Sequence, residues 1–413
     1  MTVSYIRPAQ VLQAIGDETP ETPEPVIRPG VTPTAKRTSD RRPHQWPMDC
    51  DRCDDPAVMY AAYSGAHLCG DHLRESVEKR IRRRIRRDGL VPRSASPEDP
   101  QTWVIGLSGG KDSVVLTHVL AETFADDPRI ELVCLTIHEG IEGYRDTSLD
   151  ACLELTDALD ICHEVVTYED EFGIRMDDVV TDDPENMAAC AYCGVFRRDV
   201  LSRYAEAFDA DLLLTGHNLD DEAQTALMNV LEGDVAQIAK HFEASLGPLD
   251  ERDHGGADGS GPGTVESDDV GSGTVESDDS GSGTIESDDA GSEGVDSGTT
   301  SSFVPRAKPL RDVPEKEVAL YAHTADLPAH ITECPHADEA YRGEIQRLLF
   351  DLEERHPGTR HSIMAGYEEL SSMAADRYAG DDADLAPCPS CGATTSAGSD
   401  RCRKCALLDA LNA

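Results

Sequence analysis

The stretch from Gly106 to Ser113, Gly-Leu-Ser-Gly-Gly-Lys-Asp-Ser, constrains the fold of this chain more than any other feature. It ends a short apolar run, Trp103 to Leu107, and precedes an amphipathic run, Val114 to Leu120. This order predicts a strand, a glycine turn and the first turn of a helix. Such a turn directs backbone N–H groups and the positive end of a helix dipole at one anion, and Lys111 adds a charge. The sequence therefore predicts a site for a nucleotide polyphosphate.

The residues Ser108 to Ser113 have neither the Walker A spacing nor that of the dinucleotide fingerprint. The motif resembles the PP-loop of the ATP pyrophosphatase superfamily, whose fold is adenine nucleotide alpha hydrolase-like. Enzymes of that superfamily cleave ATP between the α and β phosphates and leave AMP on an oxygen of the substrate. The resemblance implies that ATP is bound by Ser108, Gly109, Gly110, Lys111, Asp112 and Ser113. The alternative is a glycine turn without a ligand.

Apolar and amphipathic runs alternate from residue 101 to about 245. The strand-like runs are Trp103–Leu107, Leu132–Ile137, Glu164–Thr167 and Leu212–Thr215. The helix-like runs are Val114–Thr123, Ser148–Leu159, Phe196–Phe208 and Asp221–Leu231. This alternation predicts an α/β fold with a mainly parallel sheet and helices on both faces. Ligands of such folds bind at the carboxyl ends of the strands, where the glycine turn lies.

Composition divides the 413 residues into further segments. Residues 1–47 are rich in Pro and Thr, and residues 249–302 contain an acidic repeat of period ten that starts at 263, 273 and 283. Both are predicted to be disordered, with a calcium-binding β-roll as the alternative for the repeat. The other predicted segments are a zinc finger at 48–75, a basic helix and linker at 76–100, a PP-loop catalytic domain at 101–248, its remainder with helices at 303–384, and a zinc ribbon at 385–413. Within 303–384, helical patterns cover Glu315–Ala322, Asp338–Glu354 and His361–Met373.

The net charge of −43 would by itself argue against a nucleic-acid partner. Only seven of the 37 basic residues are lysine, however, and this acidic, lysine-poor composition is typical of proteins from salt-accumulating archaea. No apolar run reaches the length of a membrane span, and no signal-peptide pattern is present, so a soluble cytoplasmic protein is expected. Met48 is a candidate for the true start of the protein.

Thirteen cysteines without a secretion signal indicate metal or redox chemistry. Two sets have the paired spacing of tetrahedral structural zinc sites. The first set is Cys50, Cys53, Cys69 and His72, and the second is Cys388, Cys391, Cys402 and Cys405. Four protein ligands leave no open coordination position, so neither site is expected to be catalytic. Reduced thiols without metal are the alternative for each set.

Cys190 and Cys193 form a Cys-x-x-Cys pair with no second pair nearby, and the next cysteine along the chain is Cys334. Three thiolates around an iron–sulfur cluster would leave one iron open, whereas a redox pair would carry a persulfide and resolve it as a disulfide. The spacing does not choose between these readings or a structural role. The isolated cysteines are expected to be small core residues: Cys134, Cys152 and Cys162.

The stretch from Lys79 to Arg87 contains seven positive charges in nine residues. On a helix, these charges would surround a thin apolar stripe of Val77, Ile81 and Ile85. A phosphate backbone is the expected partner, and a solvated face paired with carboxylates is the alternative. The predicted RNA contacts are Lys79, Arg80, Arg82, Arg83, Arg84, Arg86 and Arg87. Further positive charge near the active site is expected from Arg197, Arg198, Arg306 and Lys308.

Taken in order, several motifs resemble those of the archaeal and eukaryotic cytoplasmic tRNA 2-thiouridine synthetases and their relatives from bacterial thermophiles. They are the Cys3His finger, the PP-loop, Cys190-x-x-Cys-Gly-x-Phe-Arg-Arg198, Thr215-Gly-His-Asn-Leu-Asp-Asp-Glu-Ala-Gln-Thr225, Pro305-Arg-x-Lys-Pro-Leu310, Cys334-Pro and the four-cysteine ribbon. The resemblance covers residues 48–245 and 303–406. It implies tRNA binding by the helices of 303–384.

The resemblance also implies the chemistry. The C2 oxygen of a tRNA uridine attacks the α phosphate of ATP, pyrophosphate leaves, and sulfur then displaces AMP. Adenine is expected near Ile137 and His138, with Gly216 also beside the nucleotide, and Mg²⁺ is expected on Asp112 and either Asp221 or Asp220. Cys190, Cys193 and Cys334 are expected to hold a 4Fe-4S or 3Fe-4S cluster. Asp221 and Arg197 join the catalytic set, and Arg197 stands where some relatives have lysine.

Partners follow from the same resemblance: tRNA, a ubiquitin-like sulfur carrier with a C-terminal thiocarboxylate, and a second copy in a homodimer, with no membrane. The wobble uridine is the expected target, and a thymine-loop uridine is the alternative. A tRNA cytidine thiolase and a lysidine synthetase are the competing PP-loop enzymes, which the two zinc modules disfavour. A zinc-dependent RNA-binding scaffold without catalysis is the alternative from another class.

Overall fold

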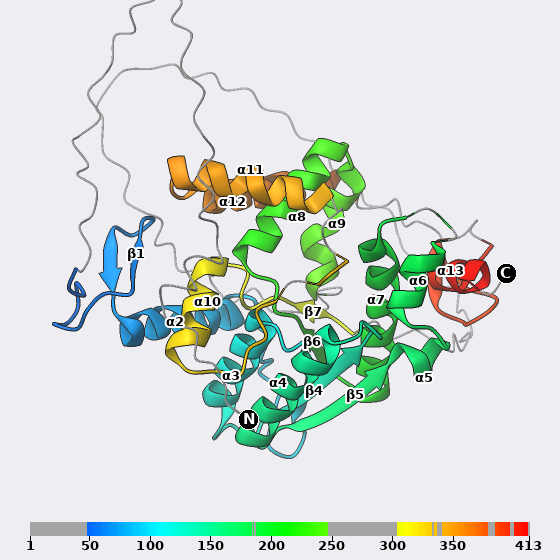
Figure 1. Ribbon diagram of the computed structural model, residues 1–413, viewed down its shortest axis with the longest axis horizontal. Helices are drawn as coiled ribbons and strands as arrows, with labels where there is room; N and C mark the ends of the chain where they lie inside the picture. Colours follow the sequence, from blue (N-terminus) through cyan, green and yellow to red (C-terminus); the bar gives the residue numbers. More distant parts are fainter. Residues whose placement is uncertain are drawn as a thin grey trace, which may run out of the picture. The chain divides into compact units, whose positions relative to one another are not determined.

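A five-stranded parallel sheet forms the centre of the computed structural model, in the order β5-β4-β3-β6-β7 (Figure 1). Its strands are β3 (Gln101–Gly106), β4 (Ile130–His138), β5 (Cys162–Thr167), β6 (Leu212–Leu214) and β7 (Arg306–Ala307). The structure describes residues 48–183, 185, 187–246, 304–332, 334–336, 341–378, 385–396 and 400–411. The parallel sheet predicted from the sequence is confirmed, and β7 is a strand that the sequence pattern did not indicate. The predicted disorder of 1–47 and of the acidic repeat lies outside the described residues.

One face of the sheet is covered by helices that flank the glycine turn. They are α2 (Gly70–Arg87), α3 (Lys111–Phe124), α4 (Tyr144–Leu159) and α10 (Glu315–Thr324). Trp103 and Ile105 of β3 point to this face and are fully buried in its apolar cluster. The predicted stripe of Val77, Ile81 and Ile85 on α2 lies in the same cluster. Because side chains alternate between the two faces along a strand, every second residue of β3 points into this layer.

The opposite face buries Val104, Val133 and Leu213 against a second set of helices. These helices are α5 (Tyr168–Phe172), α6 (Met176–Asp182), α7 (Ala189–Ala207) and α13 (Arg403–Leu411). The sequence pattern placed the start of the third helix at Phe196, but α7 begins seven residues earlier. Tyr192 and Phe196 lie one turn apart on α7 and are both fully buried, which favours the longer helix. The Cys190–Cys193 pair consequently lies in a helix.

A separate apolar cluster is built by α8 (Leu219–Glu232), α9 (Val235–Leu246), α11 (Tyr341–Arg355) and α12 (Thr359–Tyr378). Its buried members include Leu219, Ala223, Ile345 and Leu349. The helices predicted within 303–384 are thus confirmed over their described parts. Two short hairpins lie beside the paired cysteines. The hairpin of β1 (Met59–Ala61) and β2 (Ala66–Leu68) separates the two ligand pairs of the first set, and the hairpin of β8 (Leu385–Pro387) and β9 (Thr394–Ser396) carries Cys388 and Cys391 in its loop.

The isolated cysteines divide into two groups. Cys134 and Cys152 are fully buried, as predicted, whereas Cys162 is exposed, so the prediction of a core position for Cys162 was wrong. Cys162 is the first residue of the edge strand β5, which has only one neighbouring strand to cover it. Among the described residues, no helix has both the length and the apolar character of a membrane span.

Candidate functional site

The glycine turn joins the carboxyl end of β3 to the start of α3 and is closed by its own serines. The Ser108 backbone N–H donates to Ser113 Oγ at 3.1 Å, and the Ser113 hydroxyl donates to the Gly110 carbonyl at 3.0 Å. Gly109 has a φ of +77°, and a Cβ on it would overlap the carbonyl of Ser148, so only glycine fits there. The turn lies where the strand order reverses, between β3 and β6, which is where open α/β sheets bind ligands.

Gly216 brings a second backbone against the same turn. A Cβ on Gly216 would lie 2.8 Å from the backbone nitrogen of Ser113 and 2.9 Å from the carbonyl carbon of Asp112. Any side chain there would displace the first turn of α3. The stretch that begins at Thr215 therefore lies directly beside the predicted nucleotide site.

Lys111 is held by two carboxylates at the mouth of the turn. Its Nζ lies 3.0 Å from Asp112 Oδ2 and 2.8 Å from Glu315 Oε1. Burial acts to lower the pKa of Lys111, but the charges of Asp112 and Glu315 outweigh it and raise the pKa above its ordinary value. Lys111 thus stays protonated and can meet a phosphate. Glu315, from α10, is a partner that the sequence motifs did not reveal.

Asp112 and Asp221 form an acidic pair beside Lys111. Asn218 caps α8 and links them, because its side-chain amide donates to Asp112 Oδ1 at 2.9 Å and its backbone N–H donates to Asp221 Oδ2 at 3.1 Å. Burial raises the pKa of Asp112, and the nearby charge of Asp221 raises it further. Two carboxylates that repel each other in this way suit a hard divalent cation.

Asp220 has a different place. It pairs with Arg360 at 3.0 Å and accepts the backbone N–H of Glu315 at 2.9 Å. Burial raises the pKa of Asp220 to about 6. Between the two candidates for a cation ligand, the geometry favours Asp221, because the oxygens of Asp220 are already engaged by α12 and α10.

Ile137 and His138 end β4, at the carboxyl edge where the adenine was expected. His138 Nε2 lies 3.3 Å from Asp146 Oδ1, and the Gly140 N–H donates to His138 Nδ1 at 3.2 Å. Beside it lies a cavity of about 200 Å³, lined by His138, Gly140, Thr167, Glu169 and Arg175.

Cys190 and Cys193 lie in the first turns of α7, and neither forms a disulfide. Cys190 is exposed. Cys193 is partly buried against Tyr168, whose hydroxyl donates to the Cys193 carbonyl at 3.1 Å. Arg197, one turn further on, donates to Cys193 Sγ at 3.3 Å. Burial raises the pKa of the Cys193 thiol, while the charge of Arg197 opposes that rise.

Cys334 comes from a segment that crosses the glycine turn. The His330 N–H donates to the Gly109 carbonyl at 2.8 Å, and His336 Nε2 lies 2.8 Å from Asp177 Oδ1 of α6. Burial raises the pKa of Cys334, and the nearby charge of Cys190 raises it further. Cys334 and Cys193, from distant parts of the chain, both pack against the apolar cluster on the α7 face of the sheet.

A buried carboxylate, Glu139, joins the two halves of this site. It directly follows β4, is 1% exposed, and lies between Arg145 and Arg197, at 2.7 Å and 2.6 Å from their Nη2 atoms. Arg145 also donates to the Ser108 carbonyl at 3.0 Å. Glu139 and Arg145 were not among the site residues predicted from the sequence. The one feature of the sequence that could have indicated them is their position after β4, because polar residues that follow a buried strand lie at the ligand-binding edge of the sheet.

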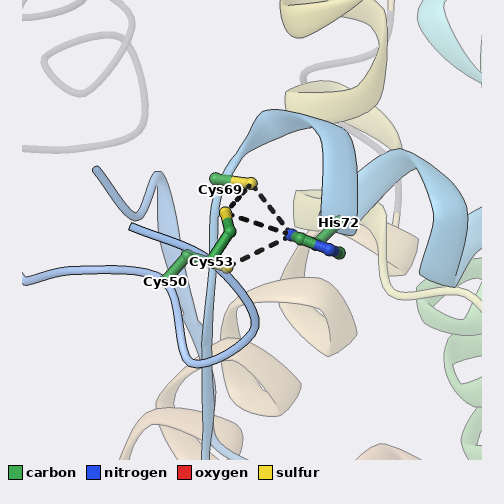
Figure 2. Close-up of side chains that lie close together, drawn as sticks. All are labelled: Cys50, Cys53, Cys69 and His72. Atoms are coloured by element: carbon green, nitrogen blue, oxygen red, sulfur yellow. Dashed lines mark hydrogen bonds between the residues drawn. The ribbon is translucent and has the colours of Figure 1, made fainter. Parts of the chain in front are cut away.

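Both zinc-like sets are brought together as predicted. In each set the four ligand atoms lie within 4.8 Å of one another. In the first set, His72 Nδ1 is 3.4, 3.5 and 3.2 Å from the sulfurs of Cys50, Cys53 and Cys69 (Figure 2). In the second set, the Cys402 N–H donates to Cys388 Sγ at 3.3 Å and lowers the pKa of Cys388 to about 6. Such clusters of free thiols fit a tetrahedral zinc ion.

Some basic side chains of α2 pair with carboxylates of the protein, and others are exposed to solvent. Arg84 is 4% exposed and donates to both oxygens of Asp312, at 3.0 and 2.7 Å. Arg80 forms an ion pair with the buried Glu317. The structure therefore does not favour these two as RNA contacts, because release of Arg80 would leave the buried Glu317 unpaired and release of Arg84 would break two hydrogen bonds to Asp312. The exposed basic residues of α2 are Lys79, Arg83, Arg86 and Arg87.

Two protein-family models match this chain. Residues 75–244 match the PP-loop domain family, and residues 49–74 match the N-terminal LIM domain of the 2-thiouridine synthetase TtuA. The chain is 62% identical over 367 residues to the tRNA 2-thiolation protein NcsA of Haloferax volcanii, covering 89% of this chain and 100% of that protein. It is 31% identical over 370 residues to the cytoplasmic tRNA 2-thiolation protein 1 of Danio rerio, covering 89% of each.

A solved structure shares the fold. The U34-tRNA thiolase NcsA from Methanococcus maripaludis, solved with its [4Fe-4S] cluster, superposes with a TM-score of 0.62 at 27% sequence identity. The match covers 88% of this chain and 96% of that one.

Proposed function

Because this chain belongs to the family of PP-loop tRNA 2-thiolation proteins, we propose that it replaces the C2 oxygen of the wobble uridine of tRNA with sulfur. It is a tRNA sulfurtransferase with an ATP-binding PP-loop domain. The name of the Methanococcus relative, a U34-tRNA thiolase, supports the wobble position over the thymine loop. The observation that supports the proposal most is that His330, four residues before Cys334, donates its N–H to the Gly109 carbonyl of the predicted nucleotide loop.

The loop side activates the uridine. Backbone N–H groups at the start of α3 and the Lys111 ammonium bind the phosphates of ATP, and Asp112 with Asp221 holds Mg²⁺ against them. The uridine C2 oxygen attacks the α phosphorus, the bond to the β phosphate breaks, and pyrophosphate leaves. The base then carries AMP on its C2 oxygen, which turns a poor leaving group into a good one.

The cysteine side delivers sulfur. The free thiols of Cys190, Cys193 and Cys334 fit a three-cysteine iron–sulfur site, and the cluster would supply an open iron that accepts sulfide. Sulfur attacks C2 of the adenylated base, and AMP leaves with the former C2 oxygen. Arg197, within 3.3 Å of Cys193 Sγ, places positive charge beside the arriving anion. The two outer cysteine sets each bind one zinc ion, which holds α2 and α13 in place.

The partners extend this proposal. A ubiquitin-like carrier with a C-terminal thiocarboxylate delivers the sulfur, and the enzyme works as a homodimer in the cytoplasm. The names of the animal relatives, cytoplasmic tRNA 2-thiolation protein 1, support the location. Affinity capture from an anaerobic lysate, followed by mass spectrometry, tests the carrier, and light scattering tests the dimer.

A complemented deletion strain tests the function. Lys111→Ala is expected to abolish 2-thiolation, because it removes the cation at the loop, while Lys316→Ala on the exposed side of α10 leaves it intact. Nuclease fragments of bulk tRNA, read by mass spectrometry, give both the amount of 2-thiouridine and its position. Normal thiolation in Lys111→Ala would refute the ATP-dependent mechanism, and loss of sulfur from the thymine loop alone would refute the wobble assignment.

A further inference from the structure

A chain of charged contacts runs from the nucleotide loop to the cysteine pair. The Ser108 carbonyl accepts from Arg145 at 3.0 Å, and Glu139 accepts from Arg145 at 2.7 Å and from Arg197 at 2.6 Å. Arg197 in turn donates to Cys193 Sγ at 3.3 Å. Glu139 is 1% exposed, so water does not compete for its oxygens. Glu139 is the acceptor shared by Arg145, which contacts the loop, and Arg197, which contacts the cysteine pair.

The two arginines are held to different degrees. Arg145 is 5% exposed, lies 5.1 Å over the ring of Tyr144 and also meets Ser148 Oγ at 3.4 Å. The Arg197 side chain is 44% exposed, and its hydrogen bonds within the described residues go to Glu139 and Cys193. Arg145 is therefore coupled closely to the loop by its contacts, whereas Arg197, at the cysteine end, is more exposed and can change its position.

We propose that Glu139 is a positioning residue that transmits nucleotide binding at the loop to the thiol of Cys193, through Arg145 and Arg197. Phosphates entering the loop reorient the peptide that carries the Ser108 carbonyl, and Arg145 moves with it. Because Glu139 bonds both guanidinium groups, a shift of Arg145 changes the position of Arg197 on the sulfur. The cysteine site then takes its working form only after ATP has bound, so that sulfur arrives at an activated base. This inference rests on the proposed function.

The test measures the thiol directly and requires no thiolation. The zinc-loaded, cluster-free protein is alkylated with iodoacetamide at one pH, with and without Mg²⁺ and α,β-methylene-ATP, and tandem mass spectrometry follows Cys193. In the wild type, the analogue is expected to change the alkylation rate of Cys193 by about threefold or more. Glu139→Gln, which keeps the shape and removes the charge, is expected to bind the analogue with a Kd within a few-fold of wild type and to lose this response.

Three further variants separate the outcomes. Glu139→Asp is expected to regain part of the response, which a purely structural role would not produce. Glu142→Gln, an exposed neighbour with the same substitution, is expected to respond as wild type does. If Glu139→Gln loses zinc or unfolds at a lower temperature than wild type, the same alkylation assay is applied to Arg145→Lys. That variant lacks the guanidinium group that donates to both the Ser108 carbonyl and Glu139.

An unchanged response in Glu139→Gln would overturn the proposal, because the analogue would then shield Cys193 without the relay. The same holds if the wild type shows no response. In either case the thiolation assay on Lys111→Ala still judges the proposed function separately.

Discussion

The two cysteine modules have nearly the same ligand chemistry but serve opposite faces of the sheet. In the first module, Cys69 immediately precedes α2 and His72 lies in its first turn. The second ligand pair therefore lies at the start of the helix that packs on α10. In the second, α13 carries Cys405 and packs Leu407 into the cluster around α7. Lys404 pairs with Asp199 of α7 at 2.8 Å. One module thus supports the face of the sheet that carries α3 and α10, and the other supports the face that carries α7.

The structural role of each cysteine module therefore depends on the surface against which its helix packs. Metal binding is the folding energy of a small module, because it has almost no core of its own. The same ion lost at the two ends is therefore expected to have different consequences.

The largest effect is expected from Cys69→Ser. This change removes a ligand of the first module at the start of α2, whose Leu73, Val77 and Ile81 are fully buried. We expect loss of one zinc and of roughly 3 kcal/mol or more of unfolding free energy. Metal analysis and urea unfolding measure both. Cys162→Ser is the matched control, since it changes an exposed cysteine, and equal stability of the two variants would contradict the prediction.

A smaller and more local effect is expected from Cys405→Ser. Zinc loss here loosens α13 from α7, so the positions of Cys190 and Cys193 are weakened while the sheet keeps its other helices. Anaerobic reconstitution is expected to incorporate less than about half the iron of wild type, with a stability loss of only about 1 kcal/mol.

Leu407→Ala sharpens this second prediction. It keeps all four cysteines and removes only the fully buried side chain between α13 and α7. If packing transmits the effect, this variant retains zinc and still loses iron. Full iron incorporation in Leu407→Ala would show that the second module acts on α7 in some other way.

On α2, the exposed and buried arginines are expected to act differently. Arg83→Gln with Arg86→Gln removes exposed charges, so tRNA affinity is expected to fall about tenfold and the salt slope by about two, with stability unchanged. Arg84→Gln removes a buried guanidinium that pairs with Asp88 and with the half-exposed Asp312, and it is expected to cost roughly 1–2 kcal/mol of stability. Filter binding over a salt series and urea unfolding test the pair. A stable Arg84→Gln protein with the larger salt effect would reverse the assignment.

The smallest difference is expected in metal release. Cys391 of the second module is exposed, whereas Cys50 and Cys69 of the first are buried. An organomercurial titrated into the wild-type protein should therefore release zinc from the second module about two- to fivefold faster. Cys391→His, read by a chromogenic zinc chelator, should slow the first release phase. Simultaneous release of both ions would mean that burial does not distinguish the modules.

Local spacing explains why much of this site could be predicted. The glycine turn, the paired cysteines and the alternation of strands and helices depend on residues within one or two turns of each other. The early start of α7 was not predicted, because Gly194 and the Cys190–Cys193 pair interrupt the helical pattern around the buried Tyr192. The exposure of Cys162 was also missed, since edge strands and central strands share the same apolar pattern.

By itself, the sequence determined the phosphate-binding turn, the parallel sheet and the two sets of four ligands, because short-range geometry and periodicity specify them. Only the tertiary structure showed that His330 contacts Gly109, that Glu139 bridges Arg145 and Arg197, and that Arg84 pairs with Asp312. The reason is physical: whether a charged side chain faces water or a partner depends on which distant surfaces are buried together. Such burial follows from packing across the whole fold, which no local spacing records.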